Sequence, residues 1–255
     1  MAAFADRYGP WAIVAGASEG LGAAFAEAIA KRGVNVVLVA RRGALLEAIA
    51  ERIEGAETRC ITADLATDVS AVVHGTEDLE LGLLVYNAAY APIGAFVERT
   101  TDELLRAVDV NVRAPVALVR ALTPAMIERG RGGVALMSSL AGQQGAPRIA
   151  TYAATKAFNT VLAEGLWSEL KPHGVDVVAS CAGAIRTPGY ANASKKDAPG
   201  TLDAEDIAEA TLDALGRGPR TTPGFVNGLA SFFMGRLLPR RTAVAVMAAS
   251  TKELS

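Results

Sequence analysis

The amino-acid sequence predicts an α/β protein with a doubly wound, mostly parallel sheet in a single three-layer αβα domain. Six apolar runs of strand length alternate with segments of helical periodicity, which is the pattern of a parallel sheet covered by helices on both faces. A glycine-rich turn joins the first run to the first helix, as in a βαβ unit. No internal repeat or long linker divides the 255 residues, so we expect one domain over residues 1–255.

The first half of the chain supplies four of these strands. Residues 11–15 form a short apolar run that ends at a glycine, which is typical of a buried strand. The helix after the turn runs to Lys31 and stops at Gly33, since glycine favours the left-handed conformation after a helix end. A valine-rich run at 34–40 is the second strand. Further strands are expected at 58–63 and 81–86, with helices at 44–53 and 69–75.

The second half continues the alternation. Residues 101–126 form one long helix or two joined helices, with Pro115 at the kink point because proline breaks the helical hydrogen-bond pattern. A helix at 203–215 carries acidic residues in its first turn, where the helix dipole favours them. The remaining expected elements are a strand at 133–137, a helix from Tyr152 to about Leu170 and a strand at 175–180.

Composition argues against several classes of protein. The formal net charge is −2 and the chain has no basic block, so we expect no nucleic-acid partner. Cys60 and Cys181 lie far apart and belong to no ligand motif, which indicates a reduced, cytoplasmic protein without a metal site. Residues 1–10 lack the apolar core of a signal peptide. The apolar segment 224–241 is interrupted by glycine and arginine, so we expect it to pack on the protein or on a partner subunit.

The predicted chemistry depends on Tyr152 and Lys156. They are four residues apart in a predicted helix and therefore share one helix face. A phenol has an unperturbed pKa of about 10, and a nearby ammonium lowers that pKa toward the range of useful proton transfer. The same pair also fits an ordinary helix with one aromatic residue and one solvated lysine. The surroundings of the pair must decide between these two interpretations.

A glycine-rich turn with Gly16, Gly20 and Gly22 follows the first predicted strand. In an open α/β sheet, ligands bind at the carboxyl ends of the strands. Glycines let the backbone approach a phosphate closely, and the helix that follows presents free N–H groups. Glycines also serve loop geometry alone, but this position between strand and helix favours dinucleotide binding.

The end of the second strand indicates which dinucleotide is bound. An acidic residue there would hold the ribose hydroxyls of NAD, but the sequence has Arg41 and Arg42. Arginine can hold a 2′-phosphate through charge-assisted hydrogen bonds, so NADP(H) is favoured. The alternative is a solvated basic turn. Glu19 in the glycine-rich turn opposes the NADP(H) interpretation, because its negative charge does not favour a further phosphate.

With these motifs in this order, the sequence resembles the short-chain dehydrogenase/reductase family, whose fold is a Rossmann-type sheet. The resemblance extends from Trp11 to about Leu215. It rests on residues 16–22, 64–65, 87–89, 111, 138–139, 152–156 and 183–187. It implies an oxidoreductase that transfers a hydride between a nicotinamide and a carbonyl or secondary alcohol.

The resemblance also implies catalytic roles for four residues. Tyr152 would exchange a proton with the substrate oxygen, and Lys156 would lower the pKa of Tyr152 and bind the nicotinamide ribose. Ser139, thirteen residues before Tyr152, would hold the substrate oxygen, with Ser138 as the weaker candidate. Asn111 would connect Lys156 to a chain of waters that resupplies protons.

Further positions are implied to bind the cofactor. Arg41 would be the main contact to the 2′-phosphate, assisted by Arg42 or Ser18. The other implied contacts are Gly16, Glu19, Gly20, Leu21 and Gly22 in the glycine-rich turn, Asp64 and Leu65 at the adenine, Asn87 and Ala88 on the ribose side, Ile185 and Thr187 at the carboxamide, and Tyr152 and Lys156 themselves.

The substrate is less defined. Residues 188–200 would be a variable substrate lid without a decodable motif, so we expect only a small to medium, apolar ketone or secondary alcohol. The resemblance implies a homodimer or homotetramer formed through the helices at 101–126 and 152–170. Two alternatives stay open: a non-catalytic NADP(H)-binding regulator on the same fold, and a membrane-surface reductase of lipid-like substrates anchored by residues 224–241. We expect no membrane association.

Overall fold

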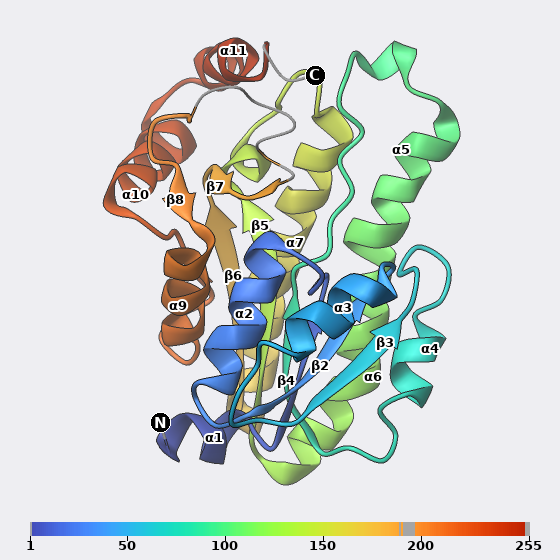
Figure 1. Cartoon of the computed structure of the whole chain (residues 1–255). Helices are drawn as coiled ribbons and strands as arrows, with labels where there is room; N and C mark the ends of the chain where they lie inside the picture. The colour runs from blue at the N-terminus through green and yellow to red at the C-terminus, as the bar shows by residue number, and fades with distance from the viewer. Residues whose placement is uncertain (1, 189, 191–196, 253–255) are drawn as a thin grey trace.

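The computed structural model describes residues 2–188, 190 and 197–252, and a seven-stranded parallel sheet forms its centre (Figure 1). The strand order is β3-β2-β1-β4-β5-β6-β9, so the chain winds outward in both directions from β1. The strands are β1 (Trp11–Ala15), β2 (Asn35–Ala40), β3 (Thr58–Thr62), β4 (Leu81–Tyr86), β5 (Gly132–Ser139), β6 (Val175–Ala182) and β9 (Arg220–Thr221). The six predicted strands are confirmed. The sequence does not predict β9, because its two residues form no apolar run.

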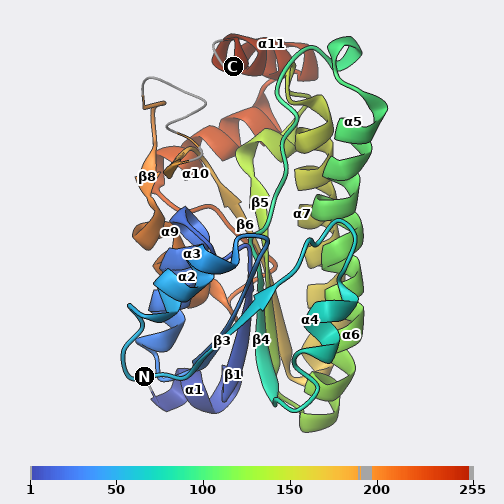
Figure 2. The same ribbon diagram turned by 45° about the vertical axis from the view of Figure 1, so that its right-hand side comes forward.

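Helices cover both faces of the sheet (Figures 1 and 2). On one face lie α2 (Gly20–Ala30), α3 (Gly43–Ala50) and α9 (Ala204–Ala214). On the other face lie α4 (Ser70–His74), α6 (Ala114–Arg129) and α7 (Ala150–Leu170). The three-layer αβα architecture is therefore as predicted.

The remaining elements lie at the ends of the sheet. Helix α1 (Ala2–Tyr8) contacts β4 and β5 and covers their amino ends. A small second sheet pairs β7 (Ile185–Arg186) with β8 (Leu202–Asp203). The C-terminal segment forms α10 (Phe225–Phe232), a π-helical turn (Phe233–Leu237) and α11 (Arg240–Thr251). Most of the predicted lid, residues 189 and 191–196, lies outside the described residues.

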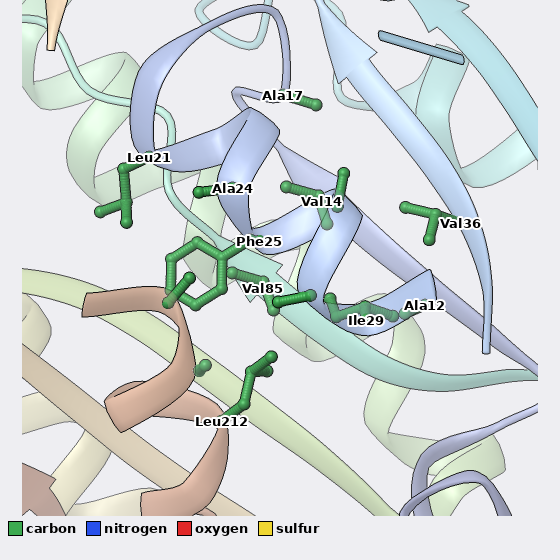
Figure 3. Packing of buried hydrophobic residues seen from close by; sticks show 14 of the residues in the cluster. Ala12, Val14, Ala17, Leu21, Ala24, Phe25, Ile29, Val36, Val85 and Leu212 are labelled. Atoms are coloured by element: carbon green, nitrogen blue, oxygen red, sulfur yellow. The ribbon is translucent and has the colours of Figure 1, made fainter. Parts of the chain in front are cut away.

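Each central strand contributes to two hydrophobic cores, because successive side chains of a strand point to opposite faces. In β1, Val14 belongs to the core under α2, whereas Ile13 belongs to the core under α6 and α7. Figure 3 shows Phe25 of α2 with Val85 of β4 and Leu212 of α9 in the first core. Burial on both faces explains why the strands are continuous apolar runs.

The long helical segment 101–129 is two helices joined by a π-helical turn. Helix α5 (Thr101–Val108) begins with a capping box, and the turn Asp109–Arg113 connects it to α6. Pro115 lies at the start of α6, directly after the π-helical turn, so its missing N–H falls where the regular α-helical hydrogen-bond pattern is already interrupted. The predicted junction is confirmed, but the irregular backbone precedes Pro115.

The segment is long and apolar enough to cross a membrane, but half of its most apolar window is buried in the protein, as in many core helices.

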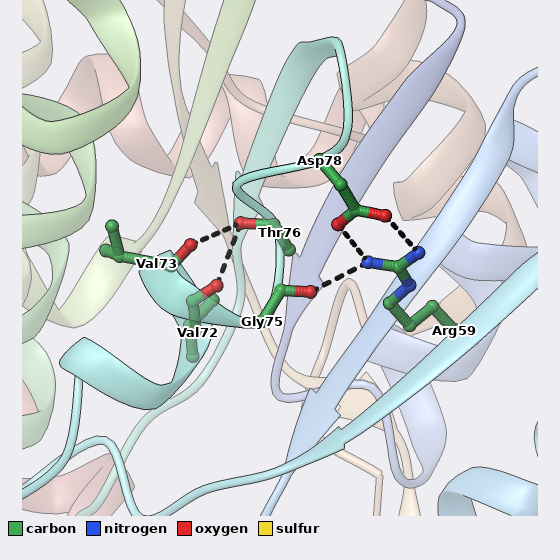
Figure 4. A network of polar contacts seen from close by, with 6 residues as sticks. All are labelled: Arg59, Val72, Val73, Gly75, Thr76 and Asp78. Carbon is green, nitrogen blue, oxygen red and sulfur yellow. Dashed lines mark hydrogen bonds and ion pairs between the residues drawn. The ribbon is translucent and has the colours of Figure 1, made fainter.

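A polar network closes the short helix α4 (Figure 4). The Thr76 hydroxyl donates to carbonyl groups of the last helical turn at 2.8 and 3.1 Å. Arg59 of β3 donates to the carbonyl oxygen of Gly75 at 2.9 Å and binds both carboxylate oxygens of Asp78. These bonds satisfy backbone carbonyls that a helix end leaves unpaired, and they fix α4 against the edge of the sheet.

Candidate active site

A cleft of about 540 Å³ lies at the carboxyl ends of β1 to β5, where an open parallel sheet binds its ligand. Most of the predicted site residues line it: Gly16, Ser18, Glu19, Gly20, Leu21, Arg41, Arg42, Asp64, Leu65, Asn87, Ala88, Tyr152, Lys156, Ile185 and Thr187. Three predicted residues, Gly22, Asn111 and Ser139, are not part of its lining.

The glycine-rich turn is shaped by close backbone contacts. Gly16 has φ +86, and a Cβ there would lie 2.7 Å from the backbone of Ala88. A Cβ on Gly20 would lie 2.8 Å from the Thr187 side chain. Glu19, at the N-cap of α2, makes no side-chain capping bond, so the first N–H groups of the helix face the cleft uncapped. This turn has the geometry that holds a phosphate group at a helix N-terminus.

Gly22 has a different position from the predicted one. A Cβ at this residue would lie 1.9 Å from the carbonyl oxygen of Gly16. Only glycine therefore fits at position 22, where α2 packs against the backbone of the glycine-rich turn. This contact lies behind the cleft surface. It shapes the phosphate-binding turn and does not line the cleft.

The two arginines after β2 differ in their surroundings. Arg42 forms an ion pair with Glu19 at 2.7 Å and donates to the Ser18 hydroxyl at 3.0 Å. Arg41 is exposed, and it has no ion pair with any residue that the structure describes. Glu19, whose charge opposed the NADP(H) interpretation, is therefore neutralised by Arg42. Arg41 lines the cleft, where its charge helps to lower the pKa of Asp64 although the two side chains form no ion pair.

An arginine that the sequence does not mark holds Asp64. Arg106 of α5 donates to Oδ2 of Asp64 at 2.7 Å, and the Ala66 amide donates to Oδ1 at 3.0 Å. Burial alone would raise the pKa of Asp64, but these hydrogen bonds outweigh it and lower the pKa below its usual value. The Arg106 guanidinium also lies 5.8 Å from the ring centroid of Tyr90, and both side chains line the cleft. No local pattern distinguishes Arg106 from a solvated helix residue, so only the fold identifies it.

Tyr152 and Lys156 lie in the first turns of α7 and face the cleft together, as the spacing predicts. Lys156 is buried, and its Nζ donates to the carbonyl oxygen of Met137 at 2.8 Å. Burial lowers the pKa of Lys156 to about 8. Burial raises the pKa of Tyr152, and a hydrogen bond with Ser139 opposes that shift. Desolvation of the phenol therefore dominates the pKa of Tyr152 in this structure, and the predicted lowering of that pKa by Lys156 stays a prediction.

The two serines at the end of β5 have different functions in the fold. The buried Ser138 hydroxyl donates to the carbonyl oxygen of Lys156 and contacts the Thr160 hydroxyl, both at 2.7 Å. Ser138 lines the cleft, but its hydroxyl is engaged in holding α7 on β5. The Ser139 hydroxyl accepts from the Ala141 amide at 3.2 Å and is the one that bonds to Tyr152. The geometry supports the choice of Ser139 over Ser138.

Asn111 lies behind the cleft in the π-helical turn and is fully buried. Its Oδ1 accepts from the Tyr90 amide, and its Nδ2 donates to the Tyr90 carbonyl oxygen, both at 2.8 Å. Nδ2 also donates to the Thr155 hydroxyl at 2.9 Å. Asn111 thus joins the loop after β4 to the residue that precedes Lys156. The predicted water chain stays a prediction.

An apolar wall lies beside Tyr152. Ile149 forms a buried cluster with small residues of the neighbouring loop, and Ile93, Tyr152 and Met247 pack against it. Ile93 and Ile149 also line the cleft. Met247 comes from α11, about a hundred residues along the chain, so local sequence patterns could not place it here.

Comparisons with known proteins agree with this fold and site. The family described as short chain dehydrogenase matches residues 10–198. The very-long-chain 3-oxoacyl-CoA reductase of Phaeosphaeria nodorum is 31% identical over 267 residues, which cover 96% of this chain and 76% of that protein. A solved structure of a 7beta-hydroxysteroid dehydrogenase has a TM-score of 0.90 at 26% identity and covers 96% of this chain and 98% of its own. A short-chain dehydrogenase from Sphingobium yanoikuyae in complex with NADPH has a TM-score of 0.78 at 31% identity, with 90% and 96% coverage.

The chain therefore belongs to the short chain dehydrogenase family, whose members are oxidoreductases that use nicotinamide cofactors. The Rossmann-type fold and the family that the sequence motifs indicate are both confirmed.

Proposed function

We propose that this protein transfers a hydride between NADP(H) and a carbonyl or secondary alcohol, with Tyr152 as general acid and base. The observation that carries the proposal is the placement of Tyr152, bonded to Ser139 and beside Lys156, in the cleft that begins at the glycine-rich turn. A bound nicotinamide would supply or accept the hydride, so the protein needs no nucleophile of its own.

The pKa shifts agree with proton donation during reduction. Because burial raises the pKa of Tyr152, the phenol stays protonated at neutral pH and can give its proton to a substrate oxygen. Ser139 would orient that oxygen through its hydroxyl. Lys156, with a pKa of about 8, keeps most of its positive charge at neutral pH and would stabilise negative charge that develops on Tyr152.

The preference for NADP(H) is supported by Arg41. Its exposed guanidinium forms no ion pair with any described residue, whereas Arg42 is paired with Glu19. A 2′-phosphate would give Arg41 a charge-assisted partner. The relative from Sphingobium yanoikuyae was solved with NADPH, which supports the same choice.

The proposed substrate is a bulky apolar ketone or the corresponding secondary alcohol. Ile93 and Ile149 present aliphatic surface to the cleft near Tyr152, with Met247 packed behind them, and such a surface favours an apolar body next to the reacting carbonyl. Two relatives are named for steroid and very-long-chain oxoacyl substrates, both of which have large apolar parts.

A panel of steroid ketones, 3-oxoacyl thioesters, small ketones and sugars, assayed by NADPH and NADH oxidation, tests the proposal. We expect turnover of a bulky apolar ketone with a higher kcat/KM for NADPH than for NADH. Faster turnover with NADH would overturn the cofactor assignment. Tight NADPH binding without turnover of any carbonyl would instead favour a regulator on the same fold.

A further inference from the structure

Helix α10 and the π-helical turn after it direct polar side chains toward the protein and large apolar side chains toward solvent. Asn227 is buried against the protein and donates to the carbonyl oxygens of Gly200 and Pro223, both at 3.0 Å. Ser231 accepts a hydrogen bond from Gln143 on the same side. In a surface helix of an isolated globular protein, polar residues face solvent and apolar residues face the core. Here the polar side of the helix faces the protein.

The opposite side of the helix presents large apolar side chains to solvent. Phe225 is 87% exposed and Leu229 is 49% exposed. We call this surface the α10 face; it consists of Phe225, Val226, Leu229, Phe232, Phe233 and Leu237. At 3.6 residues per turn these positions fall on one side of the helix. These six side chains therefore do not pack on the protein itself, and their predicted packing on a partner subunit stays a prediction.

The α10 face is bordered by positive charge. Arg236, Arg240 and Arg241 are exposed, and Arg240 donates to the carbonyl oxygen of Gln143. The sequence contains no aspartate or glutamate between residues 224 and 252. The acid that lines the adjoining cavity, Glu164, lies 3.7 Å from Arg220. This segment therefore contributes only positive charge to the border of the α10 face, in a protein whose net charge is −2.

In place of the expectation of no membrane association, we propose that the α10 face docks the protein on an anionic lipid surface, with the helix lying in the plane of the interface. Phenylalanine and leucine on one side and arginine at the border are the composition of a helix that binds at the boundary of headgroups and acyl chains. Anionic headgroups provide the negative charge that the arginines lack within their own segment. A second copy of the chain docked through the same face would bring the two arginine borders together without any acid from this segment.

Figures 1 and 2 show α10 and α11 on the side of the molecule toward which the strands β5 and β6 point. The cleft lies at the carboxyl end of the same sheet, so α10 and α11 are at the same end of the molecule as the candidate active site. The docking itself depends only on the exposed apolar and basic residues, so it does not require the proposed hydride transfer.

Vesicle sedimentation with the full chain tests the proposal. We expect the protein to pellet with vesicles of equal parts phosphatidylcholine and phosphatidylglycerol, to pellet far less with phosphatidylcholine alone, and to be released by high salt. Phe225→Ser together with Phe232→Ser should weaken binding by about tenfold or more, since both apolar anchors are lost. Arg236→Gln together with Arg241→Gln should remove the preference for phosphatidylglycerol.

Leu105→Ser is the matched control, because Leu105 is 54% exposed on α5, outside the α10 face. This variant should pellet like the unchanged protein. Thermal melting of each variant distinguishes lost binding from lost folding, and the arginine variants test the charge contribution without altering apolar packing. If the full chain stays in the supernatant with both vesicles, the proposal is wrong. If Phe225→Ser with Phe232→Ser instead converts a dimer to a monomer in sedimentation velocity, a second copy covers the face.

Discussion

The Nζ atom of Lys156 lies 2.8 Å from the carbonyl oxygen of Met137, so the ammonium on α7 is bound to strand β5. The same ammonium lies 5.4 Å from the centre of the Tyr152 ring. The lysine thus has a fixed position between the sheet and the phenol, in a buried site where its charge is costly. Its protonation state is the first property of the site that can be tested.

We expect kcat/KM for NADPH to fall as the pH rises through about 8. Burial lowers the pKa of Lys156 to about 8, so the side chain is charged below that pH and neutral above it. A neutral lysine no longer stabilises the Tyr152 phenolate and binds the cofactor less well. The pH profile of kcat/KM measures the ionisation of the free enzyme. Lys156→Gln should show low activity without an inflection near this pH, and a flat profile in the unchanged protein would contradict the assignment.

Tyr152→Phe should lower kcat by a factor of about a hundred or more, the usual contribution of a positioned general acid. The ring and its packing against Ile149 are retained, so NADPH affinity, measured by fluorescence titration, should change little. Retained turnover would show that another group donates the proton.

Substitution of one serine should lower activity, and substitution of the adjacent serine should lower stability. Ser139→Ala removes the hydroxyl that bonds to Tyr152, so we expect lower turnover with an almost unchanged melting temperature. Ser138→Ala removes buried hydrogen bonds between β5 and α7, so we expect a loss of unfolding free energy of about 1–3 kcal/mol. Assays of turnover and thermal melting on both variants check this. The opposite pattern would mean that Ser138 holds the substrate oxygen.

Arg41→Ala should raise KM for NADPH and leave KM for NADH nearly unchanged. A hydrogen bond to a charged group contributes about 1.5–3 kcal/mol, which corresponds to a factor of about 10 to 100. Arg42→Ala should have a smaller effect, because Arg42 is already paired with Glu19. Glu19→Gln is the matched control; it releases Arg42 and should not weaken NADPH binding. Equal losses for both cofactors in Arg41→Ala would contradict contact with a 2′-phosphate.

Much of the fold could be predicted because the strands of this sheet are buried on both faces. Continuous apolar runs such as 11–15 and 81–86 then mark strands directly, and the glycine-rich turn marks the order of strand and helix. Strand β9 and helix α1 lack such signals. β9 is a two-residue edge strand, and the position of α1 depends on contacts with β4 and β5 that are distant in sequence.

The sequence predicts most of the residues that line the cleft, but not how far each side chain lies from the cleft surface. Gly22 and Asn111 belong to the site by position in sequence, yet they support the cleft from behind its surface, whereas Ser139 reaches the site through its hydrogen bond with Tyr152. Spacing along a helix or strand shows which residues share a face, but the distance of each side chain from the cleft depends on tertiary packing. For the same reason Arg106 and Met247, which reach the site from α5 and α11, carry no local signal.

Asn111 connects the two ends of the site in one continuous series of contacts. Thr155 on α7 bonds to Asn111, which holds both backbone groups of Tyr90. The Tyr90 ring lies against Arg106, and Arg106 holds the carboxylate of Asp64. The side chains at opposite ends of the cleft are therefore linked through one series of direct contacts. A substitution that shifts α7 is expected to reach Asp64 through this series.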